Sequence, residues 1–174
     1  ALSVTGTPFL YKPSRLLGAM GTKNNQETTW TDALDADRID PYRPGMEGCF
    51  RCPVNCRPLN QLTPDPADKY GRGDGPEYVT LGKFGPNIGI DRIGPVVRLN
   101  NICNDLGFDT ASMGSAIGWA MELYQRGIIT DAHTGGLQLV WGDADVVDRL
   151  LFMTATREGF GNVLADSTRA VEKG

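Results

Sequence analysis

Three of the four cysteines in this 174-residue chain fall within eight residues, and this cluster constrains the fold more than any other feature. They are Cys49, Cys52 and Cys56, spaced C-x2-C-x3-C. Thiolates this close on a tight turn can bind one soft centre, and iron–sulfur clusters and zinc are the usual occupants. A disulfide framework is the weaker interpretation, because three clustered cysteines leave one unpaired and only the distant Cys103 remains to take it. The spacing therefore predicts a metal site, with a cluster favoured over zinc.

The composition excludes several classes of protein. Hydrophobic residues make up 40% of the chain and charged residues 22%, values typical of a folded domain. The formal net charge is −4 without a basic stripe, so we expect no nucleic acid partner. We also expect no membrane span, because no apolar stretch is long enough, and the N-terminal residues lack a signal-peptide core. Clustered cysteines suit a reducing compartment, which predicts a cytoplasmic protein.

The distribution of proline divides the chain at about residue 90. All but Pro95 of the 11 prolines precede that point, so residues 1–90 are expected to be a loop-rich segment that carries the cysteine turn. Only a helical turn over 14–17 and a short helix over 32–39 are predicted there. Residues 91–174 are expected to form a helical segment. The predicted fold class is mainly α, a multihelical array preceded by the loop-rich segment, and the chain is expected to be a piece of a longer polypeptide.

Capping residues and apolar spacing predict the elements of the second half. Asp91, Asp109 and Asp143 are suitable N-cap residues, and Gly107 and Gly127 are suitable helix stops. Apolar residues recur at helical spacing between them. The predicted elements are helices over 91–107, 109–127, 143–159 and 161–173, and one strand over 137–141.

Other residues with chemical potential each have a plain structural interpretation. Cys103 lies at a core-facing helix position, where a free cysteine behaves as a small hydrophobe. His133, the single histidine, is predicted to be a surface residue in a polar turn. Glu77, beside Tyr78, is by itself most often a solvated carboxylate. Asp109 at the helix junction needs no role beyond capping, although free N–H groups at a helix start can also bind a polar ligand.

Taken together, several stretches make the chain resemble the tungsten-containing aldehyde ferredoxin oxidoreductase family. The order of the motifs is more specific than any one of them, and they span nearly the whole chain. They are Leu17-Gly18-Ala19-Met20-Gly21-Thr22-Lys23-Asn24, the Cys49–Cys56 turn, Gly75-Pro76-Glu77-Tyr78, Cys103-Asn104-Asp105-Leu106-Gly107-Phe108-Asp109-Thr110, Ala120-Met121-Glu122-Leu123-Tyr124 and Arg157-Glu158-Gly159-Phe160-Gly161-Asn162. The resemblance implies a middle segment of one larger multi-domain enzyme.

The resemblance also implies the cofactors. Family members hold a [4Fe–4S] cluster beside a tungsten, sometimes molybdenum, ion chelated by two pterins. Cys49, Cys52 and Cys56 match the first three cluster ligands, and the fourth comes from a cysteine further along than this chain extends. The pterin-contacting D-x-x-G-L-D motif of the family matches residues 104–109. The resemblance therefore implies that Asn104, Gly107, Phe108 and Asp109 contact the pterin.

The catalytic carboxylate is the point at which the chain departs from the family. Many members read G-P-E-Y-E-T, where this chain has Val79 in place of the second Glu, so Glu77 is the remaining candidate. The resemblance implies oxidation of an aldehyde or another small carbonyl substrate, with electrons passed through the cluster to ferredoxin or an electron-transfer subunit, in an oligomer. Two alternatives stay open: the tungsten subunit of a benzoyl-CoA reductase, and a stand-alone iron–sulfur or zinc protein without catalysis.

Overall fold

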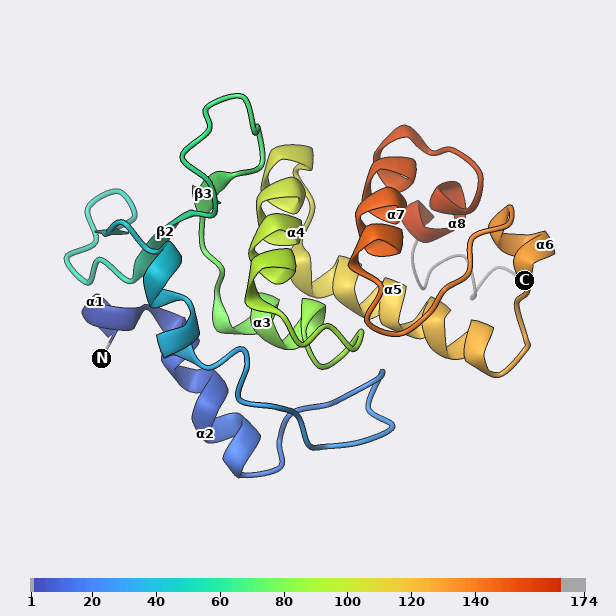
Figure 1. Ribbon diagram of the computed structural model, residues 1–174, viewed down its shortest axis with the longest axis horizontal. Helices are drawn as coiled ribbons and strands as arrows, with labels where there is room; N and C mark the ends of the chain where they lie inside the picture. The colour runs from blue at the N-terminus through green and yellow to red at the C-terminus, as the bar shows by residue number, and fades with distance from the viewer. Residues whose placement is uncertain (1, 167–174) are drawn as a thin grey trace.

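Helices account for most of the regular structure in residues 2–166, the part of the chain that this computed structural model describes. The predicted mainly α fold is confirmed. The α-helices are α1 (Leu2–Thr5), α2 (Tyr11–Leu16), α3 (Tyr78–Phe84), α4 (Ile93–Leu106), α5 (Thr110–Gln125), α6 (Asp131–Thr134), α7 (Ala144–Thr156) and α8 (Phe160–Asp166). Three short 3-10 helices, η1 (Thr7–Leu10), η2 (Ala36–Arg38) and η3 (Asp40–Tyr42), precede the sheet (Figure 1).

Gly107, Asp109 and Asp143 cap helices as predicted, whereas the N-cap of α4 is Arg92 rather than Asp91, and α7 ends at Thr156 rather than at Gly159. Helix α4 starts one residue later than expected, after Arg92, and ends at Gly107, whose φ of 74° is a left-handed conformation that glycine adopts easily. Asp109 caps α5 through a bond from the Ser112 N–H. Asp143 caps α7, since its carboxylate accepts the N–H groups of Asp145 and Val146 at 3.1 Å.

The strand predicted over Leu137–Trp141 is wrong. Side chains alternate as in a strand, with Leu137 and Leu139 buried, but within residues 2–166 the segment pairs with no other strand. Without a neighbour to satisfy its backbone groups, an alternating apolar run remains irregular chain that covers the core. The expected fourth helix is present as α8, and the predicted continuation from 167 to 173 lies outside the described residues.

The loop-rich half is more regular than predicted. It contains an antiparallel sheet in the order β1 (Met46–Glu47), β2 (Arg57–Gln61), β3 (Arg72–Asp74). Glu47 pairs with Arg57, and Asn60 pairs with Gly73. Residues 1–30, predicted to be extended or looping except for a helical turn, contain α1, η1 and α2. These short elements have little periodicity, so their stability comes from tertiary contacts rather than from local pattern.

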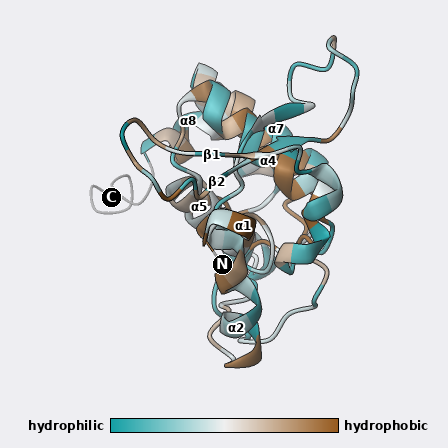
Figure 2. Ribbon diagram, turned by 90° about the vertical axis from the view of Figure 1, so that its left-hand side faces the viewer, coloured by the Kyte–Doolittle hydropathy of each residue, from teal (hydrophilic) through white to brown (hydrophobic). Residues whose placement is uncertain are grey.

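Helix α4 lies between the sheet and the C-terminal helices. It contacts β3 on one side and α7 on the other, while α3 packs on α5 (Figure 1). In Figure 2 the loop between β2 and β3, which lies outside the hydrophobic core, is coloured mainly as hydrophilic. One hydrophobic core draws on both halves, from Tyr11 and Leu34 to Ile102, Ile117 and Leu150. The predicted division at residue 90 stays a prediction. Within the described residues, no helix has both the length and the apolar character required to cross a membrane.

The contact of α5 with the end of α3 depends on a glycine. A Cβ at Gly114 would lie 2.9 Å from the Lys83 carbonyl oxygen, which is backbone and cannot rotate away. Gly114→Ala is therefore expected to lower the free energy of unfolding of the full-length protein by about 1–3 kcal/mol, measured by urea denaturation. Gly94→Ala in α4 is the control, because within the described part of the chain nothing lies within 4 Å of a Cβ built there. It should be neutral or slightly stabilising, and equal effects of the two substitutions would contradict the close packing.

Candidate functional site

The cysteine loop, residues 48–56, joins β1 to β2. Since Glu47 and Arg57 are paired, both ends of the loop are held side by side in the sheet. The Cys52 N–H donates to the Cys49 carbonyl at 2.9 Å, which closes a turn. Gly48 is required for this path, because a Cβ there would lie 2.8 Å from the Cys52 carbonyl oxygen. The sheet thus fixes where the loop begins and ends.

All three thiols on this loop are free. Cys49 is exposed, whereas Cys52 and Cys56 are half-buried. In the part of the chain that the structure describes, no three His, Cys, Asp or Glu side chains are already gathered as a metal-binding group. The donor chemistry nevertheless fits a soft metal or an iron–sulfur group, since none of the thiols is in a disulfide or in the core.

The fourth cysteine has the structural role expected of it. Cys103 is fully buried in α4. Burial, and secondarily the charge of Asp109, raises the pKa of its thiol to about 12. Because a ligand must be a thiolate, this favours a core role. His133 is exposed as predicted, and its Nδ1 accepts the Thr130 N–H at 3.1 Å in a local capping box.

A cavity of about 870 Å³ lies between β3, the start of α3 and the α4–α5 junction. Glu77, Asn104, Phe108 and Asp109 all line it, although Glu77 is 27 residues or more from the others in sequence. Gly107 lines a neighbouring cavity of about 420 Å³, which also reaches Phe108 and Asp109. The structure therefore brings the predicted non-cysteine site residues around two adjacent hollows.

Glu77 is held by the N-terminal segment. The Thr7 hydroxyl donates to its carboxylate, and the same hydroxyl oxygen accepts the Tyr78 N–H at 3.0 Å. This contact spans 70 residues and fixes the carboxylate immediately before α3. Val79, two residues after Glu77 in the first turn of α3, also lines the cavity. The carboxylate and an apolar side chain thus face the same space.

Amide side chains that the sequence analysis missed fix the cavity wall. Asn60 in β2 and Asn101 in α4 exchange two hydrogen bonds of 2.9 and 2.8 Å, and both are almost fully buried. Asn60 also donates to the Gly75 carbonyl at 3.1 Å. Asn100 and Asn104 donate to the Asp74 carbonyl at 2.6 and 3.0 Å. Three asparagines at positions 100, 101 and 104, clustered on one helix, were the sequence signal for this contact.

The charges around the cavity are mixed. The cationic side chains are Arg57, Lys69 and Arg72, and the acidic ones are Asp74, Glu77, Asp105 and Asp109. Lys69 pairs with Asp105 at 2.7 Å, and Arg57 pairs with Asp74 at 3.1 Å. The Glu47 hydrogen bond is the main cause of the raised pKa of Arg57, followed by the charge of Asp74 and, last, that of Cys49. Such a wall suits a large polar ligand that carries both hydrogen-bond donors and acceptors.

A thiol-bearing loop beside a polar cavity in a mainly helical segment is typical of a cofactor-binding part of a redox protein. A family model described as aldehyde ferredoxin oxidoreductase, domains 2 & 3, matches residues 1–174. The chain belongs to the aldehyde ferredoxin oxidoreductase family, which confirms the resemblance found in the sequence motifs.

Individual relatives agree with this assignment. The chain is 36% identical over 121 residues to the tungsten-containing aldehyde ferredoxin oxidoreductase of Pyrococcus furiosus, covering 69% of this chain and 19% of that protein. It is 37% identical over 119 residues to the aliphatic sulfonate oxidoreductase, WOR-like subunit, of the same organism, covering 68% of this chain and 19% of that one. The chain thus spans about a fifth of the length of these relatives.

A solved structure shares the fold. The active site complex BamBC of benzoyl coenzyme A reductase, in complex with 1,5-dienoyl-CoA, matches with a TM-score of 0.69 at 21% identity, covering 86% of this chain and 22% of that chain. At this level of identity the match shows a common fold.

Asp109 combines a cap with a titratable group. Hydrogen bonds from the Ser112 hydroxyl (2.6 Å) and N–H (2.7 Å) lower its pKa. A lowered folded pKa stabilises the fold above the unfolded value of about 4, and that stability is lost as pH falls through the folded pKa. Wild type should therefore lose stability relative to Asp109→Asn, which keeps a cap but does not titrate, as pH drops below about 4. At pH 7, Asp109→Ala should lower the free energy of unfolding by about 1 kcal/mol, because alanine cannot cap the helix. Urea unfolding checks both, and a pH-independent difference would contradict the role of the charge.

The paired amides generate a second prediction. Asn101→Ala leaves the buried Asn60 amide without its partner, so it should lower the free energy of unfolding by about 1–3 kcal/mol. The double variant with Asn60→Ala should lose less than the sum of the single losses, because the two residues share one interaction. Asn104→Ala, which removes an exposed amide from the same helix, is the control with a smaller loss. Additive losses at residues 60 and 101 would count against the pairing.

Proposed function

We propose that this chain is the cluster-bearing and pterin-contacting segment of a tungstopterin oxidoreductase. Cys49, Cys52 and Cys56 supply three thiolates to a [4Fe–4S] cluster. The reaction is oxidation of an aldehyde to a carboxylic acid. Electrons leave through the cluster to ferredoxin or a partner subunit, within an oligomer, and the cytoplasmic location remains a prediction.

One observation supports this proposal most. Glu77, Asn104, Phe108 and Asp109, chosen from separate motifs, line one cavity that is large enough for an extended polar cofactor. Arg57, which lines the same cavity, directly follows the last cysteine of the loop. A short stretch of β2 thus connects the thiols to the cavity, as a relay between cofactor and acceptor requires.

The residues of the chain have distinct parts in this proposal. A tungsten (or molybdenum) bis-pterin would supply the two-electron oxidation chemistry when bound. Asn104, Gly107, Phe108 and Asp109 orient the pterin through donors, acceptors and the backbone at the start of α5. Glu77, held in place by Thr7, accepts at its carboxylate a proton from the water that adds to the aldehyde carbon, and this water supplies the second carboxyl oxygen of the product. Phe108 excludes water from part of the wall.

Val79 favours a second candidate, reduction of an aromatic ring in an aryl-CoA thioester. This apolar side chain lines the cavity beside Glu77, where a second carboxylate would suit aldehyde chemistry. The common fold with the benzoyl coenzyme A reductase complex is compatible with this alternative. Assays of the full-length enzyme with aldehydes and a viologen dye, and separately with benzoyl-CoA and a low-potential reductant, distinguish the two. Turnover of benzoyl-CoA alone would exclude the aldehyde assignment.

The metal content of the full-length protein tests both candidates against a non-catalytic protein. We expect iron and tungsten, a brown chromophore, and loss of that chromophore in Cys52→Ser, because a serine hydroxyl is a much weaker ligand for cluster iron than a thiolate. Cys103→Ala is the matched control and should keep its iron, since Cys103 is a buried core thiol. Zinc alone in wild type would refute the proposed function, and an unchanged spectrum in Cys52→Ser would remove Cys52 from the ligands.

A further inference from the structure

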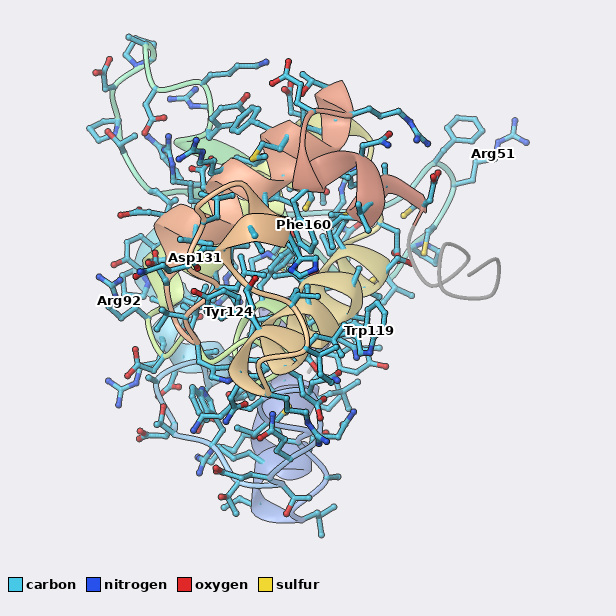
Figure 3. The ribbon with its side chains drawn as sticks, turned by 90° about the vertical axis from the view of Figure 1, so that its right-hand side faces the viewer. Arg51, Arg92, Trp119, Tyr124, Asp131 and Phe160 are labelled. Atoms are coloured by element: carbon cyan, nitrogen blue, oxygen red, sulfur yellow. The ribbon has the colours of Figure 1, made fainter. Side chains whose placement is uncertain are left out.

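Arg57 occupies the junction between the cysteine loop and the cavity. It is the first residue of β2, directly after Cys56, and its side chain lines the cavity. Strand pairing with Glu47 fixes its backbone at the neck of the loop. Arg51 on the same loop does not contact the sheet in this way, because its side chain projects away from the body of the molecule (Figure 3). Its guanidinium carbon lies 5.0 Å from the centroid of the exposed Phe50 ring.

Two carboxylates from the flanking strands hold the Arg57 guanidinium. Its Nη2 lies 2.5 Å from Glu47 of β1, and its Nη1 lies 3.1 Å from Asp74 of β3. Its Nε is buried and has no hydrogen-bond partner among residues 2–166. The Arg57 side chain is 36% exposed, and these two contacts favour a position of its guanidinium at the neck of the loop.

We propose that Arg57 is a positioning residue that sets the reduction potential of the iron–sulfur group on the cysteine loop, an inference that rests on the proposed function. Reduction adds one electron, and thus one negative charge, to that group. A fixed cation beside the loop stabilises the reduced form, whereas Glu47 and Asp74 stabilise the oxidised form. Arg57 offsets part of the field of these carboxylates and thereby raises the reduction potential of the iron–sulfur group.

Removal of the charge gives the first test. In the full-length enzyme, Arg57→Gln should shift the midpoint potential to more negative values, because the two carboxylates are left unbalanced. Arg57→Lys, which keeps the charge but loses the two-sided clamp, should fall between wild type and Arg57→Gln. The measurement is a mediated potentiometric titration followed by electron paramagnetic resonance, which reports the potential independently of turnover.

Glu47→Gln separates charge from loosening of the loop. Removal of this carboxylate should shift the potential to more positive values, opposite to Arg57→Gln. A purely structural role would disturb the same ion pair in both variants and shift both potentials alike. If Arg57→Gln fails to assemble, Glu47→Gln still carries the test, and an unchanged potential there overturns the inference.

Arg72→Gln is the matched control. Arg72 lines the same cavity but pairs with Gln61, at the far end of β2 from the cysteine loop. The four residue-to-residue steps from Arg57 to Gln61 separate the two ends of the strand by about 13 Å, which exceeds the screening length of about 8–10 Å. Arg72→Gln should therefore shift the potential less than Arg57→Gln does, and equal shifts would refute the local role of Arg57. Wild-type protein without iron would refute the proposed function itself, whereas an iron-loaded protein with an unchanged Arg57→Gln potential would refute this inference alone.

Discussion

The buried amide pair between Asn60 and Asn101 is the interaction on which the rest of this structure depends. It joins β2 to α4 across 41 residues of sequence. Because both amides are buried, each would lose its hydrogen bond without gaining one to water if the other were removed. Asn60 also bonds the Gly75 carbonyl, which leads directly into Glu77. These hydrogen bonds thus fix the sheet, the cavity wall and the start of α3 relative to one another.

The sheet, although small, relates two kinds of chemistry. One end of β2 carries Arg57 and the cysteine loop, while Asn60 near its other end reaches the helical array. The strand therefore fixes the position of the cysteine loop relative to the cavity. Because β1 and β3 flank β2, their carboxylates also reach the same guanidinium. Strand pairing in this way converts short, irregular sequence into a defined electrostatic environment.

Local signals made the helices and part of the site predictable. Asp109, Asp143 and Gly107 act through hydrogen bonds and dihedral angles within a few residues, so their roles follow from neighbouring sequence. Leu137–Trp141 shows the limit of the same reasoning. Its alternation is genuine, but a strand also needs a partner, and partners are chosen by packing across the whole chain.

By itself the sequence determined the caps at Gly107, Asp109 and Asp143, the family, and the three thiols that one short loop presents, because each of these depends on spacing along the chain. Only the tertiary structure decided that Glu77 meets Thr7, that Asn60 meets Asn101, and that Arg57 lies between two carboxylates. Those contacts join segments from 10 to 70 residues apart. Spacing cannot specify them, since side chains distant in sequence meet only when burial of the common core brings their elements together.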